Sequence, residues 1–424
     1  MSTLFDEFTW RGMVYDATEG LAELLATERV TAYIGFDPTA SSLHVGSLLP
    51  VMALARLQRF GHSPVAIVGG GTGMIGDPSG KSQERTLLTL EQLDHNVAGL
   101  REQLARFLDF ERADNTARLV NNADWLASFD LLGFLRDTGK YFTVNYMLQK
   151  ESVNRRLESE EGISYTEFSY LLLQARDFLE LFDRFGCTVQ LGGSDQWGNI
   201  TAGIDLIRKL RARKAHGLVM PLVTTASGVK FGKTEAGTIW LDPARTSPFR
   251  FYQFWLNTDD RDVVPYLKYF TFLDRDTIEA VDATGREAPG KREAQRLLAR
   301  EMTTLVHGGE QMARAERASS VLFGEDITTL SADDVLSVFE DVPSAELPAA
   351  ALDGDGIGMV DLVARAQLAG SKSDARRLVQ SGGVYVNNRR INDPQTRLTR
   401  AHAIEGRLIL LRKGQRQNVL VRLT

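Results

Sequence analysis

Residues 33–47 read Tyr33-Ile-Gly-Phe-Asp-Pro-Thr-Ala-Ser-Ser-Leu-His-Val-Gly-Ser47. The first residues are typical of a strand that delivers its last side chains to a loop, and Pro38 stiffens that loop. A serine at position 41 or 42 can cap a helix that begins near residue 43, so His44 is expected in its first turn. The stretch predicts a strand, a loop and a helix, the unit of α/β sheets.

Similar short apolar runs recur along the first half of the chain. Val65-Ala-Ile-Val68 is stopped by three glycines and predicts a central, buried strand. Residues 31–34 and 188–191 are also followed by glycine-containing loops and helical periodicity. Strands that alternate with helices predict a parallel α/β sheet, which binds ligands at the carboxyl ends of its strands.

The rest of the chain changes character three times. Residues 247–325 have the apolar spacing of helices, and residues 326–356 are acidic and rich in Ala, Ser, Pro and Gly, as in a linker. Residues 357–424 hold thirteen Lys and Arg against four Asp and Glu, a net charge of +9, which leaves −15 on residues 1–356. A compact basic module on an acidic body indicates nucleic-acid contact, with a solvated basic surface as the alternative.

Composition bounds the class of protein. With 424 residues, of which 43% are hydrophobic, the chain can form two or three domains. The N-terminus lacks a basic region followed by an apolar core, and no apolar run approaches the roughly 18 residues that span a bilayer. The single cysteine, Cys187, excludes an intrachain disulfide, and the six histidines have no metal-ligand spacing. We expect a cytoplasmic protein without membrane segment or metal site.

Two glycine motifs are misleading. Residues 71–76 match G-x-G-x-x-G, but the turn-forming Asp77-Pro-Ser-Gly follows in place of the helix that a dinucleotide fingerprint needs. Gly80-Lys-Ser82 resembles the end of a P-loop, yet Ile75 stands where that motif requires glycine. Both stretches are therefore predicted to be loops.

Two other segments suit a triphosphate. A helix N-terminus offers free N–H groups and partial positive charge, so Thr39, His44 and Gly46 are suited to hold phosphates; a capped helix with an incidental histidine is the alternative. In Lys230-Phe-Gly-Lys-Thr234, nearby glycines keep two lysines on a flexible chain. Such a loop either is solvated or closes over a triphosphate and neutralises charge on departing pyrophosphate.

A third pattern lies on a helix predicted to start near Tyr165. Tyr170, Gln174 and Asp177 fall at i, i+4 and i+7, one polar line on an otherwise apolar helix. Such a line faces either solvent or a polar cavity. The apolar character of the remaining faces favours the cavity.

Together these segments resemble the class I aminoacyl-tRNA synthetases, and specifically the bacterial tyrosyl-tRNA synthetases, over nearly the whole chain. His44-Val-Gly-Ser47 is similar to the HIGH element, with Ser47 in place of its second His, and residues 230–234 are similar to the KMSKS loop. Gly192-Gly-Ser-Asp-Gln-Trp-Gly-Asn-Ile200 resembles the tyrosyl signature, and residues 370–387 resemble an RNA-binding module of ribosomal small-subunit protein four.

The resemblance implies a Rossmann-like catalytic domain with an insertion (1–246), a helical anticodon-arm domain (247–325), a linker (326–356) and a small α+β RNA-binding module (357–424). It also implies the site residues. Catalysis would fall to Thr39, His44, Lys230, Lys233 and Thr234. Tyrosine would be held by Tyr33, Asp77, Tyr170, Gln174, Asp177 and Gln190. ATP would be held by Gly35, Asp37, His44, Gly46, Ser47, Gly193, Asp195, Gln196 and Lys233. RNA would be held by Lys372, Arg376, Arg377, Arg389 and Arg390.

The implied reaction joins L-tyrosine to ATP, giving tyrosyl-adenylate and pyrophosphate, and then transfers tyrosine to the 3′ end of tRNA(Tyr). It needs no protein nucleophile and no tightly bound cofactor, since Mg²⁺ arrives on ATP. The family also implies a homodimer. Two alternatives stay open: a tryptophanyl-tRNA synthetase, which shares the fold and both nucleotide motifs, and a synthetase-like RNA-binding protein with impaired catalysis, which Ser47 and the basic tail suggest.

Overall fold

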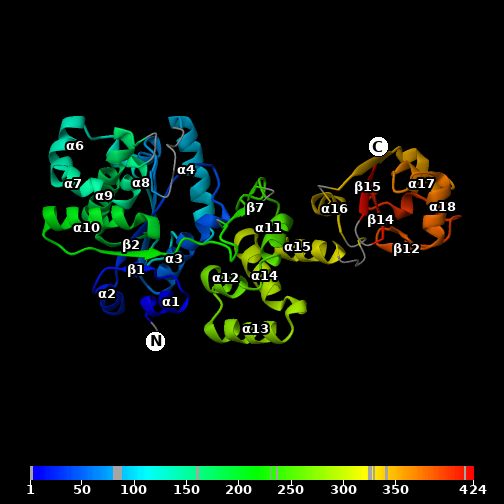
Figure 1. The fold of residues 1–424 in the computed structure, drawn as a ribbon, viewed down its shortest axis with the longest axis horizontal. Coiled ribbons are helices and arrows are strands. Elements are labelled where there is room, and N and C mark those ends of the chain that lie inside the picture. The colour runs from blue at the N-terminus through cyan, green and yellow to red at the C-terminus, as the bar shows by residue number, and fades with distance from the viewer. Residues whose placement is uncertain are drawn as a thin grey trace. The chain divides into compact units, whose positions relative to one another are not determined.

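A computed structural model of the chain describes residues 3–79, 88–158, 162–229, 231–234, 237–322, 327, 330–339, 342–414 and 417–424. The chain forms two compact units (Figure 1). The first unit comprises Met1–Thr246 and Thr258–Leu298, and the second comprises Ser247–Asn257 and Ala299–Thr424. Among the described helices, none has the length and apolar character needed to cross a membrane.

The first unit is built on a six-stranded sheet with the order β1-β6-β5-β2-β3-β4. Its five inner and edge strands β2 to β6 are parallel, and only the short β1 is antiparallel. This confirms the predicted Rossmann-like parallel sheet, with β3 buried between two parallel neighbours. The strands are β1 (Asp16–Ala17), β2 (Thr31–Phe36), β3 (Ser63–Val68), β4 (Arg118–Asn121), β5 (Cys187–Gly193) and β6 (His216–Met220).

Helices pack on this sheet through apolar faces. α9 and α10 share a core in which Phe178 and Leu179 meet Ala202 and Leu206, and all four side chains are fully buried. The helices of this unit are α1 (Leu4–Trp10), α2 (Leu21–Thr27), α3 (Leu48–Arg59), α4 (Leu90–Leu104), α5 (Ala123–Leu126), α6 (Leu131–Asp137), α7 (Val144–Leu148), α8 (Glu151–Leu157), α9 (Tyr165–Phe185), α10 (Trp197–Arg211), α12 (Val263–Phe270) and α13 (Arg275–Glu287).

The region after residue 246 is helical, as its periodicity predicts, but the compact units divide it differently from the predicted domain 247–325. α12 packs on α3 and so belongs to the first unit, whereas α11 (Pro248–Leu256) packs on α15 (Gly309–Leu322) in the second. α14 (Glu293–His307) runs across the boundary of the two units. Periodicity identifies helices but not their packing partners, which is why the predicted boundary differs.

The second unit contains a five-stranded sheet with the order β12-β11-β14-β15-β9. Val384, Ile409 and Val421 bury one of its faces against α17 and α18, while Leu410 and Leu420 pack with residues of α16. The elements are α16 (Ala332–Val338), β9 (Ser344–Leu347), β10 (Ile357–Gly358), α17 (Met359–Arg365), α18 (Lys372–Gln380), β11 (Val384–Val386), β12 (Arg389–Ile391), β13 (Arg397–Leu398), β14 (Leu408–Lys413) and β15 (Gln417–Leu423).

One difference concerns the predicted linker, residues 326–356. It contains α16 and β9, and β9 adds a parallel edge strand to β15 with Leu347 fully buried. The compact C-terminal part therefore begins before Ile357. A composition rich in small residues resembles a linker, and the pairing with a strand some seventy residues later is invisible to local pattern.

Candidate active site

A cavity of about 840 Å³ opens at the carboxyl ends of the parallel strands of the first unit. Its wall includes residues that follow or end β2, β3, β4 and β5, together with one face of α9. Fifteen residues that the sequence nominated line it together. These are Tyr33, Gly35, Asp37, Thr39, His44, Gly46, Ser47, Asp77, Tyr170, Gln174, Asp177, Gln190, Gly193, Asp195 and Gln196.

The polar line on α9 faces this cavity, which confirms the interpretation made from its spacing. The helix begins after Ser164, whose hydroxyl accepts the N–H of Glu167, and ends at Gly186, which has a left-handed backbone conformation. Arg176 does not belong to that polar line. Its guanidinium pairs with Glu180 and lies over the ring of Phe129.

The segment around His44 differs from the predicted capped helix. A 3₁₀ turn, η1 (Val45–Ser47), leads into α3, and His44 itself is the cap, because its Nδ1 accepts the N–H of Gly46 at 3.0 Å. In the neutral ring the proton therefore lies on Nε2. The expected serine cap near residue 43 was wrong: Ser42 instead donates to the Leu43 carbonyl and accepts the main-chain N–H of Asp242.

The lysine-containing segment lies directly against this turn. β7 (Lys233–Thr234) and β8 (Gly237–Thr238) form a hairpin, and the Ile239 carbonyl after it accepts the N–H of Val45 at 3.0 Å. Gly232 has φ +82°, and a Cβ there would lie 2.7 Å from Val45 Cγ2. The two nucleotide motifs are therefore neighbours, although Lys230 lies outside the described residues and only the backbone of Lys233 and Thr234 is described.

Both carboxylate oxygens of Asp177 accept hydrogen bonds from buried side chains. Its Oδ1 accepts the indole N–H of Trp125 at 2.7 Å and its Oδ2 accepts Nδ2 of Asn122 at 2.9 Å. Burial raises the pKa of Asp177 to about 7, against the opposing effect of these two hydrogen bonds. The sequence analysis did not predict Asn122 and Trp125 as site residues. They could have been found from their position just after β4, at the edge of the sheet where the other site residues lie.

Tyr33 completes this end of the cavity. Its ring packs edge-on against Phe178, with the centroids 5.2 Å apart, and only 1% of the residue is exposed. Burial, and then the charge of Asp177, raise the pKa of Tyr33 well above its usual value. Among the described residues its hydroxyl has no hydrogen-bond partner. A buried, unpaired hydroxyl near a buried carboxylate suits a ligand hydroxyl that accepts from one and donates to the other.

A chain of amides holds a second buried carboxylate of the cavity, Asp77. Gln196 donates to Asp77 Oδ2 at 2.8 Å, and Gln174 in turn donates to Gln196 at 3.2 Å. Asn199, which the sequence analysis also missed, donates to Gln174 at 2.9 Å. Burial and the charge of Asp37 raise the pKa of Asp77 to about 6, against hydrogen bonds from Ser79 and Gln196. Two neighbouring carboxylates make this region suitable for a cation.

The glycine motif at 71–76 is a loop, as predicted. A 3₁₀ turn, η2 (Thr72–Met74), takes the place of a helix, and Asn122 Oδ1 accepts the N–H of Gly71 at 2.8 Å. The loop therefore positions Asn122, which positions Asp177. Residues 80–82 lie outside the described part of the chain.

The basic residues nominated for RNA lie in the second unit. Lys372, Arg376 and Arg377 project from α18, whose other face buries Ala375 and Val379. All three are exposed, although Lys372 pairs with Asp361 and Arg377 with Asp374. Arg389 and Arg390 are exposed on β12.

Strand pairing adds two residues that sequence analysis missed. Tyr385 on β11 lies between Arg390 on β12 and Arg412 on β14, and Arg412 in turn pairs with Asn418 on β15. The Arg412 guanidinium lies 3.9 Å from the centre of the Tyr385 ring. An aromatic ring in contact with an arginine on a basic sheet offers stacking and positive charge in one place.

Comparisons with known proteins agree over the whole chain. Residues 25–324 match the family of class I tRNA synthetases (W and Y), and residues 334–421 match the SYY-like C-terminal domain of tyrosine–tRNA ligase. The tyrosine–tRNA ligase of Roseiflexus castenholzii is 57% identical over 423 residues, covering 100% of both chains. That of Geobacillus kaustophilus is 53% identical, covering 99% of each chain.

Solved structures show the same relationship. A C-terminally truncated mitochondrial tyrosyl-tRNA synthetase of Aspergillus nidulans is 32% identical, with a TM-score of 0.70, and the match covers 76% of this chain and 95% of that one. A tryptophanyl-tRNA synthetase of Encephalitozoon cuniculi, 15% identical with a TM-score of 0.53, shares the fold.

Proposed function

Since the chain belongs to the tyrosyl-tRNA synthetases of class I, we propose that its cavity binds L-tyrosine beside ATP and that the pair Tyr33 and Asp177 recognises the substrate. The enzyme is a tyrosine–tRNA ligase: it activates L-tyrosine with ATP and transfers it to tRNA(Tyr). The observation that carries the site assignment is the unpaired Tyr33 hydroxyl near a doubly hydrogen-bonded, buried Asp177.

Tyrosine fits this pair because its phenol both donates and accepts. The substrate hydroxyl donates to Asp177 and accepts from Tyr33, which satisfies both groups. Phenylalanine leaves the buried Tyr33 hydroxyl unpaired, at about 1–3 kcal/mol, and it gives Asp177 no donor beyond Asn122 and Trp125. Tryptophan carries an indole N–H that donates only, so the Tyr33 hydroxyl stays unpaired. The site therefore favours tyrosine over both.

The substrate ammonium belongs at the opposite end, beside Asp77. We assign Tyr170, Gln174 and Gln190 to the same end, where the amide chain orients Asp77. The Oε1 atom of Gln190 is buried without a hydrogen-bond partner among the described residues, which suits an N–H of the ligand. The ammonium and carboxylate of the substrate are thereby held in one orientation.

In the first step a tyrosine carboxylate oxygen attacks the α-phosphorus of ATP. A new P–O bond forms, the bond to the bridging oxygen breaks, and pyrophosphate leaves with the electron pair. We assign Thr39, in the loop after β2, and His44 and Gly46, at the turn before α3, to the nucleotide side, where we also place Lys230, Lys233, Thr234 and the Mg²⁺ that ATP brings. Their role is to stabilise charge that develops on the phosphates.

In the second step a hydroxyl of the terminal ribose of tRNA attacks the tyrosyl carbonyl carbon, and AMP leaves. We assign Lys372, Arg376, Arg377, Arg389 and Arg390 to phosphate contacts in the second unit. Tyr385 and Arg412 form a stacking surface for unpaired bases beside them. We place the reaction in the cytoplasm, where these substrates are found together.

We further propose that the enzyme is a homodimer. Large apolar side chains are exposed on α6, α7 and the first residue of α9: Leu131 (71%), Leu132 (76%), Val144 (59%) and Tyr165 (72%). Exposed apolar surface of this kind is typical of subunit contacts. Sedimentation should give a dimer mass, and the double variant Leu131→Asp with Leu132→Asp should sediment as a monomer. A monomer mass for the unaltered protein at every concentration contradicts the proposal.

The deciding experiment is ATP–pyrophosphate exchange without tRNA, with tyrosine, phenylalanine or tryptophan supplied separately. We expect exchange with tyrosine alone. Tyr33→Phe should raise the KM for tyrosine, because one hydrogen bond to the phenol is removed, at about 0.5–1.5 kcal/mol. A folded protein that binds tRNA but exchanges with none of the three supports the RNA-binding alternative instead.

A further inference from the structure

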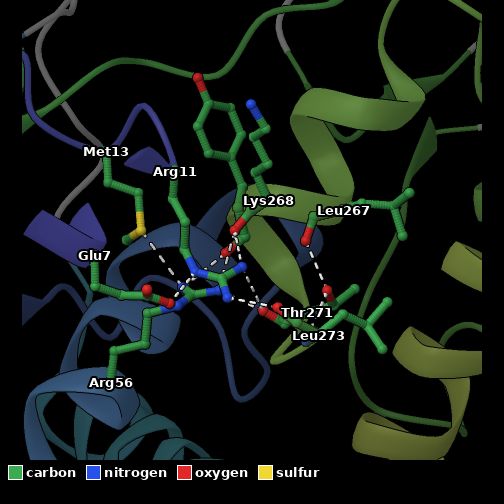
Figure 2. A network of polar contacts seen from close by, with 9 residues as sticks. Glu7, Arg11, Met13, Arg56, Leu267, Lys268, Thr271 and Leu273 are labelled. Atoms are coloured by element: carbon green, nitrogen blue, oxygen red, sulfur yellow. Dashed lines mark hydrogen bonds and ion pairs between the residues drawn. The ribbon is translucent and has the colours of Figure 1, made fainter. Parts of the chain in front are cut away.

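Two arginines with no direct place in the cavity form a buried network in the first unit (Figure 2). Arg56 comes from α3 and Arg11 directly follows α1; 1% of Arg56 and 3% of Arg11 is exposed. Together they donate six hydrogen bonds to main-chain carbonyls at the end of α12 and just after it. The acceptors are the carbonyls of Lys268, Tyr269, Thr271 and Leu273.

This arrangement explains how two guanidiniums can be buried side by side. One carboxylate, Glu7, pairs with Arg11. Burial, and then the charge of Arg11, lower the pKa of Arg56. The carbonyls of Lys268 and Tyr269, in the last turn of α12, carry the negative end of the helix dipole and have no intrahelical partner, and those of Thr271 and Leu273 follow the helix. The network therefore fixes the C-terminal end of α12 to α3.

The other side of α12 carries the segment that leads into the lysine loop. The Phe231 ring stacks on Phe270, with the centroids 5.2 Å apart and the planes at 12°, and meets the edge of Tyr266 at 4.8 Å. Asp262, the residue before α12, accepts the N–H of Ala226 at 3.0 Å. The Tyr266 hydroxyl donates to the Thr224 carbonyl at 3.4 Å. Three points along α12 therefore hold this segment.

The held segment lines the cavity. Thr224, Gly228 and Phe231 are among the lining residues, and the next residue, Gly232, lies against Val45 at the turn before α3. The nucleotide turn precedes α3, and Arg56 near the C-terminal end of α3 hydrogen-bonds to the end of α12. α12 in turn contacts the loop segment, which lies against the nucleotide turn. Contacts therefore run from the nucleotide turn along α3 to α12, from α12 to the loop segment, and from the loop segment back to the nucleotide turn.

We propose that Arg11 and Arg56 are positioning residues for the activation step: by fixing the end of α12, they set where residues 223–229 and 231–232 lie relative to the nucleotide turn. The inference rests on the proposed function of the cavity. Displacement of groups around a reacting phosphate by even about 1 Å can lower the rate up to about a hundredfold, so disruption of this network acts on chemistry from a distance. Tyrosine binding, which uses Tyr33 and Asp177, is not touched by it.

The test is the single-turnover rate of tyrosyl-adenylate formation in the full-length protein, with the Kd for tyrosine measured separately by equilibrium dialysis. Arg56→Met keeps a long apolar side chain but leaves the Tyr269 carbonyl without a guanidinium donor, and it removes one of the two guanidinium donors from the carbonyls of Lys268 and Thr271. We expect the rate to fall between about tenfold and a hundredfold, and the Kd for tyrosine to stay within about twofold. Arg56→Lys, which restores a donor, should recover part of the rate.

A matched control separates positioning from stability. Asn115 is also buried and donates to two carbonyls, that of Gln58 in the last turn of α3 and that of His62 just after it; among the described residues it makes no hydrogen bond to α12. Asn115→Ala should lower the thermal midpoint as Arg56→Met does, yet leave the adenylate rate within about twofold. The double variant Arg11→Met with Arg56→Met should be no slower than the worse single variant, because both residues act through one helix end.

Asp262→Ala is the variant to measure if the arginine variants do not fold. It releases Ala226 from α12 without opening the buried network, and its carboxylate makes no cap to α12 itself. We expect the same decrease in rate at unchanged tyrosine affinity. Wild-type rates in both Arg56→Met and Asp262→Ala would overturn the inference and leave the network a purely structural one. Absence of activity in the unaltered protein would instead contradict the proposed function.

Discussion

At the scale of single residues, the site depends on carboxylates that the fold keeps away from water. Asp177 and Asp77 have the same side chain as the exposed Asp137, whose pKa is lowered by its hydrogen bond with Arg136. Burial instead raises the pKa of Asp177 to about 7 and that of Asp77 to about 6. The chemical type of a residue is thus less informative than the partners that the fold gives it.

The raised pKa of Asp177 predicts a pH-dependent affinity for tyrosine. The phenol donates to the ionised carboxylate, which forms as the pH rises through about 7. We expect kcat/KM for tyrosine in pyrophosphate exchange to increase over this range, and Asp177→Asn to abolish the increase. A profile for the unaltered enzyme that is flat between about pH 6 and about 8 contradicts the assignment of Asp177 to the phenol.

The same shift predicts how stability changes with pH. Between the ordinary pKa of 3.8 and about 7, the folded protein holds a proton on Asp177 that the unfolded chain has lost. The free energy of unfolding therefore falls as pH rises through this window, by about 1.4 kcal/mol per unit at most for this group. Urea unfolding of the ligand-free protein should show a smaller decline in Asp177→Asn; parallel curves for the two proteins would refute the shift.

At the scale of elements, the contact between the lysine-containing hairpin and α3 depends on one glycine. Gly232 combines a positive φ of +82° with a close approach, because a Cβ would lie 2.7 Å from Val45 Cγ2 and 3.3 Å from the Gly46 nitrogen. Either condition alone disfavours a side chain. The hairpin can therefore reach the nucleotide turn only if this residue lacks a Cβ.

We predict that Gly232→Ala slows adenylate formation by about tenfold or more, because it pushes the hairpin from the nucleotide turn. The KM for tyrosine should stay within about twofold. Gly61→Ala is the matched control, since Gly61 also has a positive φ, +89°, lies outside the cavity lining, and an added Cβ there would meet nothing within 4 Å. Equal effects in both variants would mean that backbone strain, rather than the contact with Val45, slows the reaction.

At the scale of the whole molecule, basic charge is concentrated in one part of the chain. Residues 357–424, which belong to the second unit, carry +9 and residues 1–356 carry −15, whereas the cavity lies in the first unit. We proposed that this basic part holds tRNA. Amino-acid activation needs only the cavity, whereas transfer needs tRNA to be held. The two steps should therefore respond to different substitutions.

We predict that Arg376→Gln with Arg377→Gln weakens tRNA(Tyr) binding and reduces its salt dependence, by a slope of about 0.7–0.9 for each phosphate that the protein no longer neutralises. Pyrophosphate exchange should be unchanged. Tyr385→Ala should weaken binding without changing the salt slope, because stacking carries no charge. Arg29→Gln, an exposed arginine of the first unit, serves as control. Impaired exchange in the α18 double variant contradicts the separation of the two activities.

Local features of the chain were predictable to the extent that they depend on near neighbours. The strands at β2, β3 and β5, the helix from Tyr165 and the polar line on it follow from periodicity within a dozen residues. The start of α3 was misplaced because Ser42 uses its hydroxyl for the Leu43 carbonyl and for Asp242, 200 residues away, and leaves the cap to His44. The linker was misassigned because β9 pairs with a distant strand.

By itself, the amino-acid sequence determined the class of fold and the alternation of strands and helices in the first half of the chain, because strand ends and apolar periodicity are local signals. Most residues of the cavity were expected from the resemblance to a family, and the structure brings them together at one edge of the sheet. Only the tertiary structure decided which residues hold the site residues in place. Trp125 and Asn122 reach Asp177 from more than fifty residues away, and Arg11 and Arg56 meet the end of α12 from more than two hundred. Hydrogen-bond partners and burial, which set pKa and position, arise from packing between segments whose separation along the chain carries no local signal.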